Sequence, residues 1–94
     1  MSRTIKSILQ TERTCLICGS PQTETHHIFF GTSNRKISDR EGFIAFLCPE
    51  HHRGEYSPHH DRQIDLWLKK RCQERYEETH TRQEFIALIG KSYL

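Results

Sequence analysis

Apolar residues recur at intervals of three and four positions in the last third of the chain. The members of this stripe are Ile64, Trp67, Leu68, Cys72 and Tyr76. The spacing is that of an amphipathic helix, so it predicts a helix after Ser57-Pro58 that runs to about residue 78 and buries the stripe in the core. A second apolar run, residues 85–89, follows Thr81-x-x-Glu84 and precedes Gly90. A capping box before the run and a glycine after it predict a second C-terminal helix.

Two short apolar runs upstream predict strands at residues 26–30 and 43–47. The connection between them is too long for a tight hairpin. Within it, Ser38-x-x-Glu41 resembles a capping box on a single helical turn. Pro49 suits the first position of a short helix that Gly54 would end.

The first 14 residues carry Ile5, Ile8 and Leu9 at helix-like spacing, but the segment is short and uncapped. We interpret it as an N-terminal arm or short helix that packs on the domain. The chain as a whole, residues 1–94, is expected to form a single α+β domain, with a core segment at 15–54 and C-terminal helices within 60–94.

A chain of 94 residues with 34% hydrophobic content has a small core, and small domains are often stabilised by an additional cross-link. Four cysteines offer either disulfides or a structural metal. No apolar segment follows Met1 as in a secretory signal, and no run is long enough to span a membrane, so we expect a cytoplasmic protein without a membrane partner. Cytoplasmic thiols stay reduced, which favours metal.

The cysteine spacing predicts a structural zinc site. Cys15-x2-Cys18 followed by glycine has the form of a zinc knuckle, and Cys48-x2-His51 supplies a thiolate and an imidazole at the same spacing. Two such half-sites some thirty residues apart predict a Cys3His site, although His52 could replace His51 as the ligand. In the competing interpretation, Cys48 is a small buried hydrophobe and the other two cysteines form a redox pair, but no βαβ context is visible.

The remaining histidines predict a second, catalytic type of site. His26 and His27 would lie on opposite faces of a strand, so one can bind a cation while the other acts on a water beside it. His52 would complete the cation site with His26 if zinc ties the short helix to the knuckle. The His59-His60 pair has three interpretations: a third metal ligand, a phosphate contact, or an exposed helix start without a role in the site. A lone histidine is usually structural, but three His-His pairs in one short chain reverse that expectation.

Charge is only mildly basic, with a formal net charge of +2 and a pI near 8.4, which neither demands nor excludes a polyanionic partner. The cations are clustered, however, and either contact phosphates or belong to solvated faces. The two clusters are Arg35, Lys36 and Arg40, and Lys69, Lys70, Arg71 and Arg75.

The strings Cys-x2-Cys, His-His-Ile and Leu-Cys-x2-His-His resemble the HNH endonucleases, also called His-Me finger or ββα-metal nucleases, over about residues 15–54. The resemblance implies a zinc-stabilised ββα-metal core with added C-terminal helices. It further implies structural zinc on Cys15, Cys18, Cys48 and His51, the last in place of the usual cysteine. It assigns a catalytic Mg²⁺, Mn²⁺, Ni²⁺ or Zn²⁺ to His26 and His52 and makes His27 the general base. The His59-His60 pair lies outside the common motif, and His59 or His60 is a candidate third ligand from its residue type alone.

A wider pattern, His-His-Ile-Phe-Phe-Gly, Asn-Arg-Lys, Pro-His-His and a terminal Gly-Lys-Ser-Tyr-Leu, resembles small phage proteins of this family, including relatives of the recombination nuclease Ref. It implies a DNA rather than an RNA partner, a phage recombination or packaging partner and, for a phage protein, the host cytoplasm.

One position departs from the family pattern: the middle Asn, which braces the ββ loop, is replaced by Phe43, and Asn34 is the candidate substitute.

Two functions from different classes are therefore expected. The first is a metal-dependent endonuclease that hydrolyses phosphodiester bonds, and the second is a zinc-stabilised module that binds nucleic acid without cutting it. His27 discriminates between them, because a binding module has no need of a second imidazole beside His26, whereas a hydrolase needs both a ligand and a base.

Overall fold

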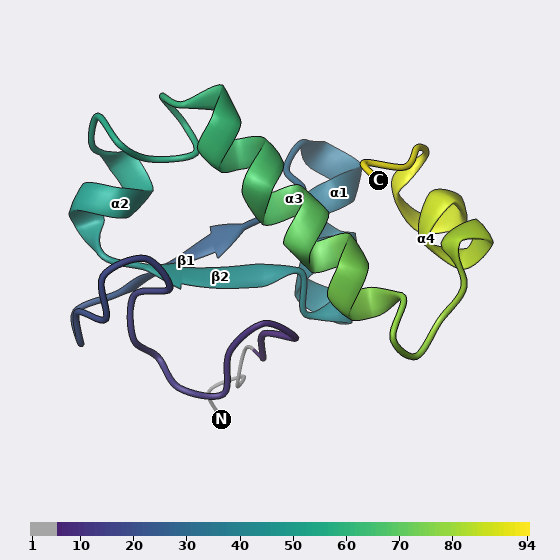
Figure 1. The fold of residues 1–94 in the computed structure, drawn as a ribbon, viewed down its shortest axis with the longest axis horizontal. Coiled ribbons are helices and arrows are strands. Elements are labelled where there is room, and N and C mark those ends of the chain that lie inside the picture. The colour runs from purple at the N-terminus through teal and green to yellow at the C-terminus, as the bar shows by residue number, and fades with distance from the viewer. Residues whose placement is uncertain (1–5) are drawn as a thin grey trace.

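The computed structural model describes residues 6–94, so Ile5 and the start of the predicted N-terminal arm lie outside the described residues. Within the described part, two strands and four helices form a small α+β fold (Figure 1). The elements in chain order are β1 (Glu24–His27), α1 (Thr32–Glu41), β2 (Ile44–Leu47), α2 (Pro49–Arg53), α3 (Arg62–Tyr76) and α4 (Arg82–Ile89). None of the helices in this part of the chain is long and apolar enough to cross a membrane.

The two strands pair antiparallel, with His26 opposite Ala45 and His27 opposite Ile44. β1 begins two residues and ends three residues before the predicted run of residues 26–30. The Ile28 amide still donates to the Phe43 carbonyl at 2.9 Å. Successive strand residues point to opposite faces. His26 is accordingly buried, whereas the side chain of His27 keeps 19% exposure.

Helix α1 fills the connection between the strands, and the predicted capping box at Ser38 is wrong. The helix begins six residues earlier, at Thr32, so Ser38 lies inside it and is fully buried. Its hydroxyl donates to the Phe29 carbonyl at 2.7 Å. A buried hydroxyl that satisfies a buried carbonyl fixes α1 against the end of β1.

Helix α3 crosses in front of the sheet and packs on one shared core (Figure 1). Leu68, Cys72 and Tyr76 are buried as predicted, but the prediction for Trp67 is wrong, because this side chain is 44% exposed. At 100° per residue Trp67 lies about 100° around the helix from Leu68, on the outer face. The rings of Phe29, Phe43 and Phe85 form an aromatic cluster with centroids 5.5 to 6.0 Å apart.

The predicted ends of helices α2 and α4 are confirmed. Thr81 and Glu84 form the reciprocal capping box of α4, and Gly90 ends it in the left-handed conformation. Helix α2 spans only Pro49–Arg53. At Gly54 a Cβ atom would lie 2.3 Å from the Glu50 carbonyl oxygen, so glycine is required where the chain turns away. The short helix α2 carries both His51 and His52.

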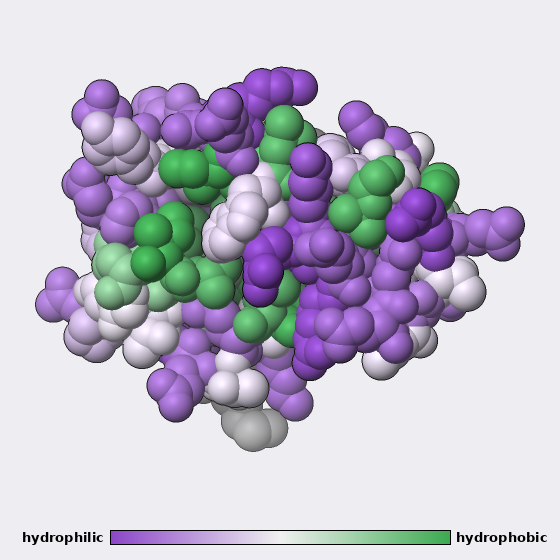
Figure 2. All heavy atoms as spheres, in the orientation of Figure 1, coloured by the Kyte–Doolittle hydropathy of each residue, from purple (hydrophilic) through white to green (hydrophobic). Residues whose placement is uncertain are grey.

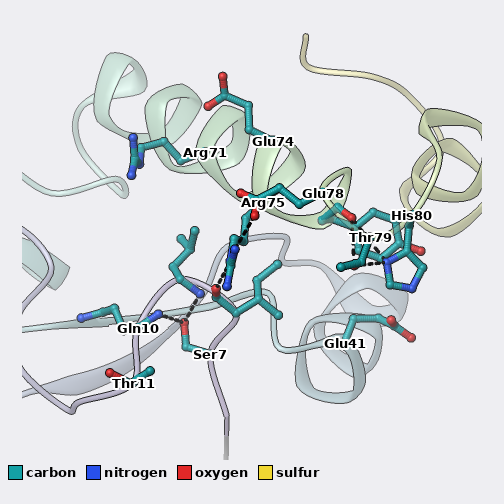
Figure 3. Close-up of a pocket in the computed structure, with 13 residues that line it drawn as sticks. Ser7, Gln10, Thr11, Glu41, Arg71, Glu74, Arg75, Glu78, Thr79 and His80 are labelled. Atoms are coloured by element: carbon teal, nitrogen blue, oxygen red, sulfur yellow. Dashed lines mark hydrogen bonds and ion pairs between the residues drawn. The ribbon is translucent and has the colours of Figure 1, made fainter.

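The segment before the knuckle packs as an irregular arm, not a helix, in its described part. The Ile8 amide donates to the Gly42 carbonyl at 2.9 Å, and the Phe46 amide donates to Oε1 of Gln10 at 2.8 Å. The arm thus packs along β2 and the residue Gly42 before it, without joining the sheet as a strand. Between the arm and the end of α3 lies a cleft of about 640 Å³ (Figure 3). Arg75 crosses this cleft, and its Nε donates to the Ile8 carbonyl at 3.0 Å.

Candidate metal centres

The knuckle and α2 bring three thiols and one imidazole together. Cys15, Cys18, Cys48 and His51 each offer one ligand atom, and these atoms all lie within 4.8 Å of one another. Sγ of Cys18 is 3.7 Å from Sγ of Cys48, and Nδ1 of His51 is 3.2 Å from Sγ of Cys48. Zinc–sulfur bonds of about 2.3 Å in a tetrahedron place two sulfurs about 3.8 Å apart. The cluster therefore has the dimensions of a tetrahedral metal site.

Local sequence explains how the four ligands converge. The Cys15 amide donates to the Ser20 carbonyl and the Gly19 amide to the Cys15 carbonyl, both at 2.8 Å, which closes a tight turn. Gly19 has a φ of 81°, a conformation that suits glycine. Cys48 is the N-cap of α2, and its position three residues before His51 places both on one side of the first helical turn.

Hydrogen bonds of the same turn also shift the pKa values of the thiols. Burial raises the pKa of Cys15, but backbone N–H groups of Cys48, Cys18 and Ile17 outweigh it and lower the pKa to about 6. A thiolate is the form that binds metal. For Cys18 the Ser20 amide lowers the pKa, but burial and the neighbouring thiols Cys15 and Cys48 outweigh it, so the net shift is upward. One thiolate is thus favoured before metal binding, and a cation would be needed to hold all three.

Three other histidines form a second cluster. His26 comes from β1, His52 from α2 and His59 from the connection between α2 and α3. Their ring centroids are 5.2 to 5.3 Å apart, and one ring nitrogen of each lies within 4.8 Å of the others. His60, the other residue predicted as a third ligand, is exposed and lies outside the cluster.

The buried side of this cluster has an unsatisfied atom. Nε2 of His26 is buried and has no hydrogen-bond partner, whereas buried polar groups are normally paired. Burial, followed by the neighbouring His52 and His59, lowers the pKa of His26 to about 3, so this imidazole is neutral near pH 7. Burial and His52 also lower the pKa of His59. Neutral imidazoles with free nitrogen lone pairs are the form that ligates divalent metals.

A carboxylate that the sequence analysis did not single out orients His52. Nδ1 of His52 donates to Oε1 of Glu24 at 2.7 Å, which leaves Nε2 as the lone-pair atom. Arg53 donates to both oxygens of the same carboxylate, at 3.0 and 2.7 Å. The His52 hydrogen bond, followed by Arg53, lowers the pKa of Glu24. The only available signal was that Glu24 lies two residues before His26, on the same face of β1.

His27 has a carboxylate partner of its own on α1. Its Nε2 lies 2.7 Å from Oδ1 of Asp39, and the side chain of Asp39 is 44% exposed. Because an ionised carboxylate only accepts, Nε2 carries the proton and Nδ1 keeps a lone pair. The His27–Asp39 pair can therefore accept a proton from a bound water. Nothing in the local sequence around Asp39 indicated this contact.

The predicted cationic residues lie on two helices. Arg35, Lys36 and Arg40 are exposed on α1, and Lys70 and Arg71 are exposed on α3. Lys69 differs, because its side chain is 13% exposed, and Nζ lies 2.8 Å from Asp65 and 4.8 Å from the Phe30 ring centroid. Lys69 contributes to the lowered pKa of His26, which places its charge beside the histidine cluster.

Phe43 and Asn34, the two positions compared with the family's middle Asn, lie in different surroundings. Phe43 is fully buried in the aromatic cluster, and Asn34 makes no side-chain hydrogen bond within the described residues. The contact from the Ser38 hydroxyl to the Phe29 carbonyl braces this connection, and the suggested substitution by Asn34 stays a prediction.

Comparisons of this chain with protein-family models, curated proteins and solved structures find no match.

Proposed function

We propose that this protein is a metal-dependent nuclease of the HNH type that hydrolyses phosphodiester bonds, with DNA as its substrate. The observation that supports this most directly is the buried, unpartnered Nε2 of His26 within an imidazole cluster, directly followed in sequence by a histidine with its own carboxylate. In this proposal β1, β2 and α2 form the ββα-metal core, and α1 is an elaboration of the loop between the strands.

His26, His52 and His59 would hold the catalytic cation. Imidazole nitrogens fit Mn²⁺, Ni²⁺ or Zn²⁺ better than Mg²⁺, which prefers oxygen ligands. A bound divalent ion supplies charge stabilisation at the phosphate and at the leaving oxygen. Glu24 engages Nδ1 of His52, so Nε2 is the nitrogen that would ligate the cation.

His27 would be the general base. Asp39 fixes its tautomer, so that Nδ1 can accept a proton from the attacking water. The developing imidazolium is stabilised by the same carboxylate at 2.7 Å, as in other His–Asp pairs. Water activation of this kind contributes about 100- to 10,000-fold to a rate.

The Cys3His cluster has a separate role in this proposal. With three thiolates and one imidazole it would hold a structural zinc ion, which fixes α2 to the knuckle and so places His52 next to His26. The exposed cations Arg35, Lys36 and Arg40 on α1, with Lys70 and Arg71 on α3, would contact phosphates of the substrate.

The test is cleavage of plasmid and single-stranded DNA by zinc-loaded protein with added Mn²⁺, Ni²⁺, Mg²⁺ or Zn²⁺. We expect cation-dependent cleavage that His27→Ala reduces at least 100-fold without loss of zinc or DNA affinity. His60→Ala is the matched control, because His60 follows a cluster residue but lies outside the cluster. If no cation supports cleavage while DNA binding persists, the binding-module function replaces the nuclease.

A further inference from the structure

A shallow groove of about 380 Å³ lies between the zinc knuckle and the first half of α3. It is lined by Leu16, Ile17, Asp61, Gln63, Ile64 and Trp67. In Figure 2 hydrophobic residues gather on the left of the visible face, between the knuckle loop and α3 as drawn in Figure 1. No residue of this groove belongs to either metal cluster, so the groove needs its own explanation.

The floor of the groove exposes large apolar side chains. Trp67 is 44% exposed and Ile17 is 39% exposed, although the core lies directly behind α3. The Arg71 guanidinium carbon is 5.6 Å from the centroid of the Trp67 ring. An exposed aromatic ring beside an arginine provides a flat surface on which another planar, electron-rich group can stack.

The charge around Trp67 favours an anionic occupant. Lys70 and Arg71 follow Trp67 by three and four positions and therefore flank it on the helix surface. Neither has an ion-pair partner within the described residues, whereas Lys69 on the next face is paired with Asp65. The carboxylate of Asp61 already accepts from the Gln63 and Ile64 amides as the N-cap of α3.

We propose that this groove binds an unpaired nucleobase, stacked on Trp67, while Lys70 and Arg71 contact the adjoining phosphates. Aromatic platforms flanked by cations are the usual means of holding single-stranded nucleic acid. The volume of about 380 Å³ falls in the range of about 300 to 1,000 Å³ for small-ligand sites.

The inference rests on the proposed function only in taking the bound strand to be the substrate. Asp61 lies in the groove two residues after His59, which belongs to the histidine cluster. A strand that passes the cluster would therefore reach Trp67, about 9 Å further along the α3 axis than Asp61 at 1.5 Å per residue. The preferred substrate would therefore have an unpaired or frayed end next to the cleaved bond.

Trp67 is the single tryptophan of the chain, so its fluorescence reports on this groove alone. Zinc-loaded protein without a second cation is titrated with oligothymidylate, with a fully paired duplex of equal phosphate count, and with inorganic phosphate. We expect saturable quenching by the single strand only. These two variants lack the tryptophan, so their affinity is measured by the fluorescence anisotropy of end-labelled oligothymidylate, with the wild type alongside. Trp67→Ala should weaken single-strand affinity about 5- to 100-fold, and Trp67→Phe should recover part of it. Arg82→Gln, which removes a cation paired with Glu77 on α4, should have no effect.

Tight binding of the single strand with unchanged tryptophan emission would overturn the groove assignment while leaving the nuclease proposal intact. Equal quenching by the duplex would also overturn it. A concentration-dependent dimer in sedimentation that Trp67→Ala abolishes would show that the groove holds a second copy of the chain instead. Conversely, specific quenching without cleavage under any cation would retain the groove and exclude the nuclease.

Discussion

Nδ1 of His52 lies 2.7 Å from Oε1 of Glu24, so an α2 imidazole is oriented by the first residue of β1. Arg53 donates to both oxygens of this carboxylate and holds it in place. The relationship links the elements that carry His26 and His52, two of the three histidines of the cluster, and it fixes which nitrogen of His52 is free. Carboxylate–histidine pairs of this kind orient metal ligands and raise their basicity.

Glu24→Ala should therefore weaken cation binding at the histidine cluster about 10- to 100-fold. The measurement is calorimetric titration of zinc-loaded protein with Mn²⁺ or Ni²⁺. The cation affinity of Glu24→Gln should lie between those of the wild type and Glu24→Ala, because its amide oxygen still accepts from Nδ1 of His52. Glu55→Ala, an exposed carboxylate nearby in sequence, is the control. Equal affinity in all four proteins would show that Glu24 does not position a ligand.

A second prediction concerns the Cys3His cluster. Cys48→Ser should lose tightly bound metal and much of the helical circular dichroism, because metal binding to such a site is coupled to folding. Cys72→Ala is the matched control, since Cys72 is also a buried thiol but lies outside the cluster. Elemental analysis should give about one zinc per chain in the control and none in the Cys48 variant. Retained zinc and unchanged stability in Cys48→Ser would disprove the assignment.

The third prediction separates the role of Asp39 from that of His27. Asp39→Asn should reduce cleavage strongly, because an amide no longer dictates the tautomer of His27 or stabilises its imidazolium. In a double-mutant cycle with His27→Ala, the second change should add almost nothing. Cation affinity, measured in parallel, should stay unchanged in both single variants. Additive losses would mean that Asp39 acts independently of the base.

Ser38 supports a fourth prediction, on stability. Ser38→Ala removes the hydroxyl that satisfies the buried Phe29 carbonyl and should cost about 1 to 3 kcal/mol in the free energy of unfolding. Ser33→Ala, on an exposed position of the same helix, should be neutral or slightly stabilising. Denaturant unfolding of zinc-loaded protein measures both. A loss no larger in Ser38→Ala than in Ser33→Ala would remove Ser38 from its bracing role.

The features that could be predicted from the sequence are those set by residues close together in the chain. Cys15 and Cys18, the ends of α2 and the capping box at Thr81 all follow from residues within a few positions of each other. The choice between His51 and His52 required the helix itself, because only the direction of α2 separates the two rings. Contacts between distant segments were missed: Glu24 meets His52 across 28 positions, and Asp39 meets His27 from a helix that was expected to be one turn.

The same limit explains the error at Trp67. Its spacing fits the apolar stripe of α3, but the core covers a narrower arc of the helix than the stripe occupies, so Leu68 is buried and Trp67 is not. Periodicity identifies a helix and its approximate inner face. It does not show which apolar residue at the edge of that face is left in solvent, where it becomes available for binding.

The last prediction tests whether Lys36 on α1 and Lys70 on α3 contact phosphates of bound DNA. Both side chains are exposed and lack an ion-pair partner within the described residues. Replacing both by Gln should reduce the slope of log K against log salt by about 1.8, since each phosphate contact on duplex DNA contributes about 0.9. Binding is measured by fluorescence anisotropy over a series of salt concentrations.

A double variant of Lys91→Gln and Arg82→Gln removes the same charge from the C-terminal part and serves as the control. Arg82 is already paired with Glu77, and Lys91 packs over the ring of Tyr93. The control should leave the slope unchanged, which would show that local placement rather than net charge determines the effect. If both double variants reduce the slope equally, DNA is held by diffuse charge, and neither α1 nor α3 forms a defined phosphate-binding surface.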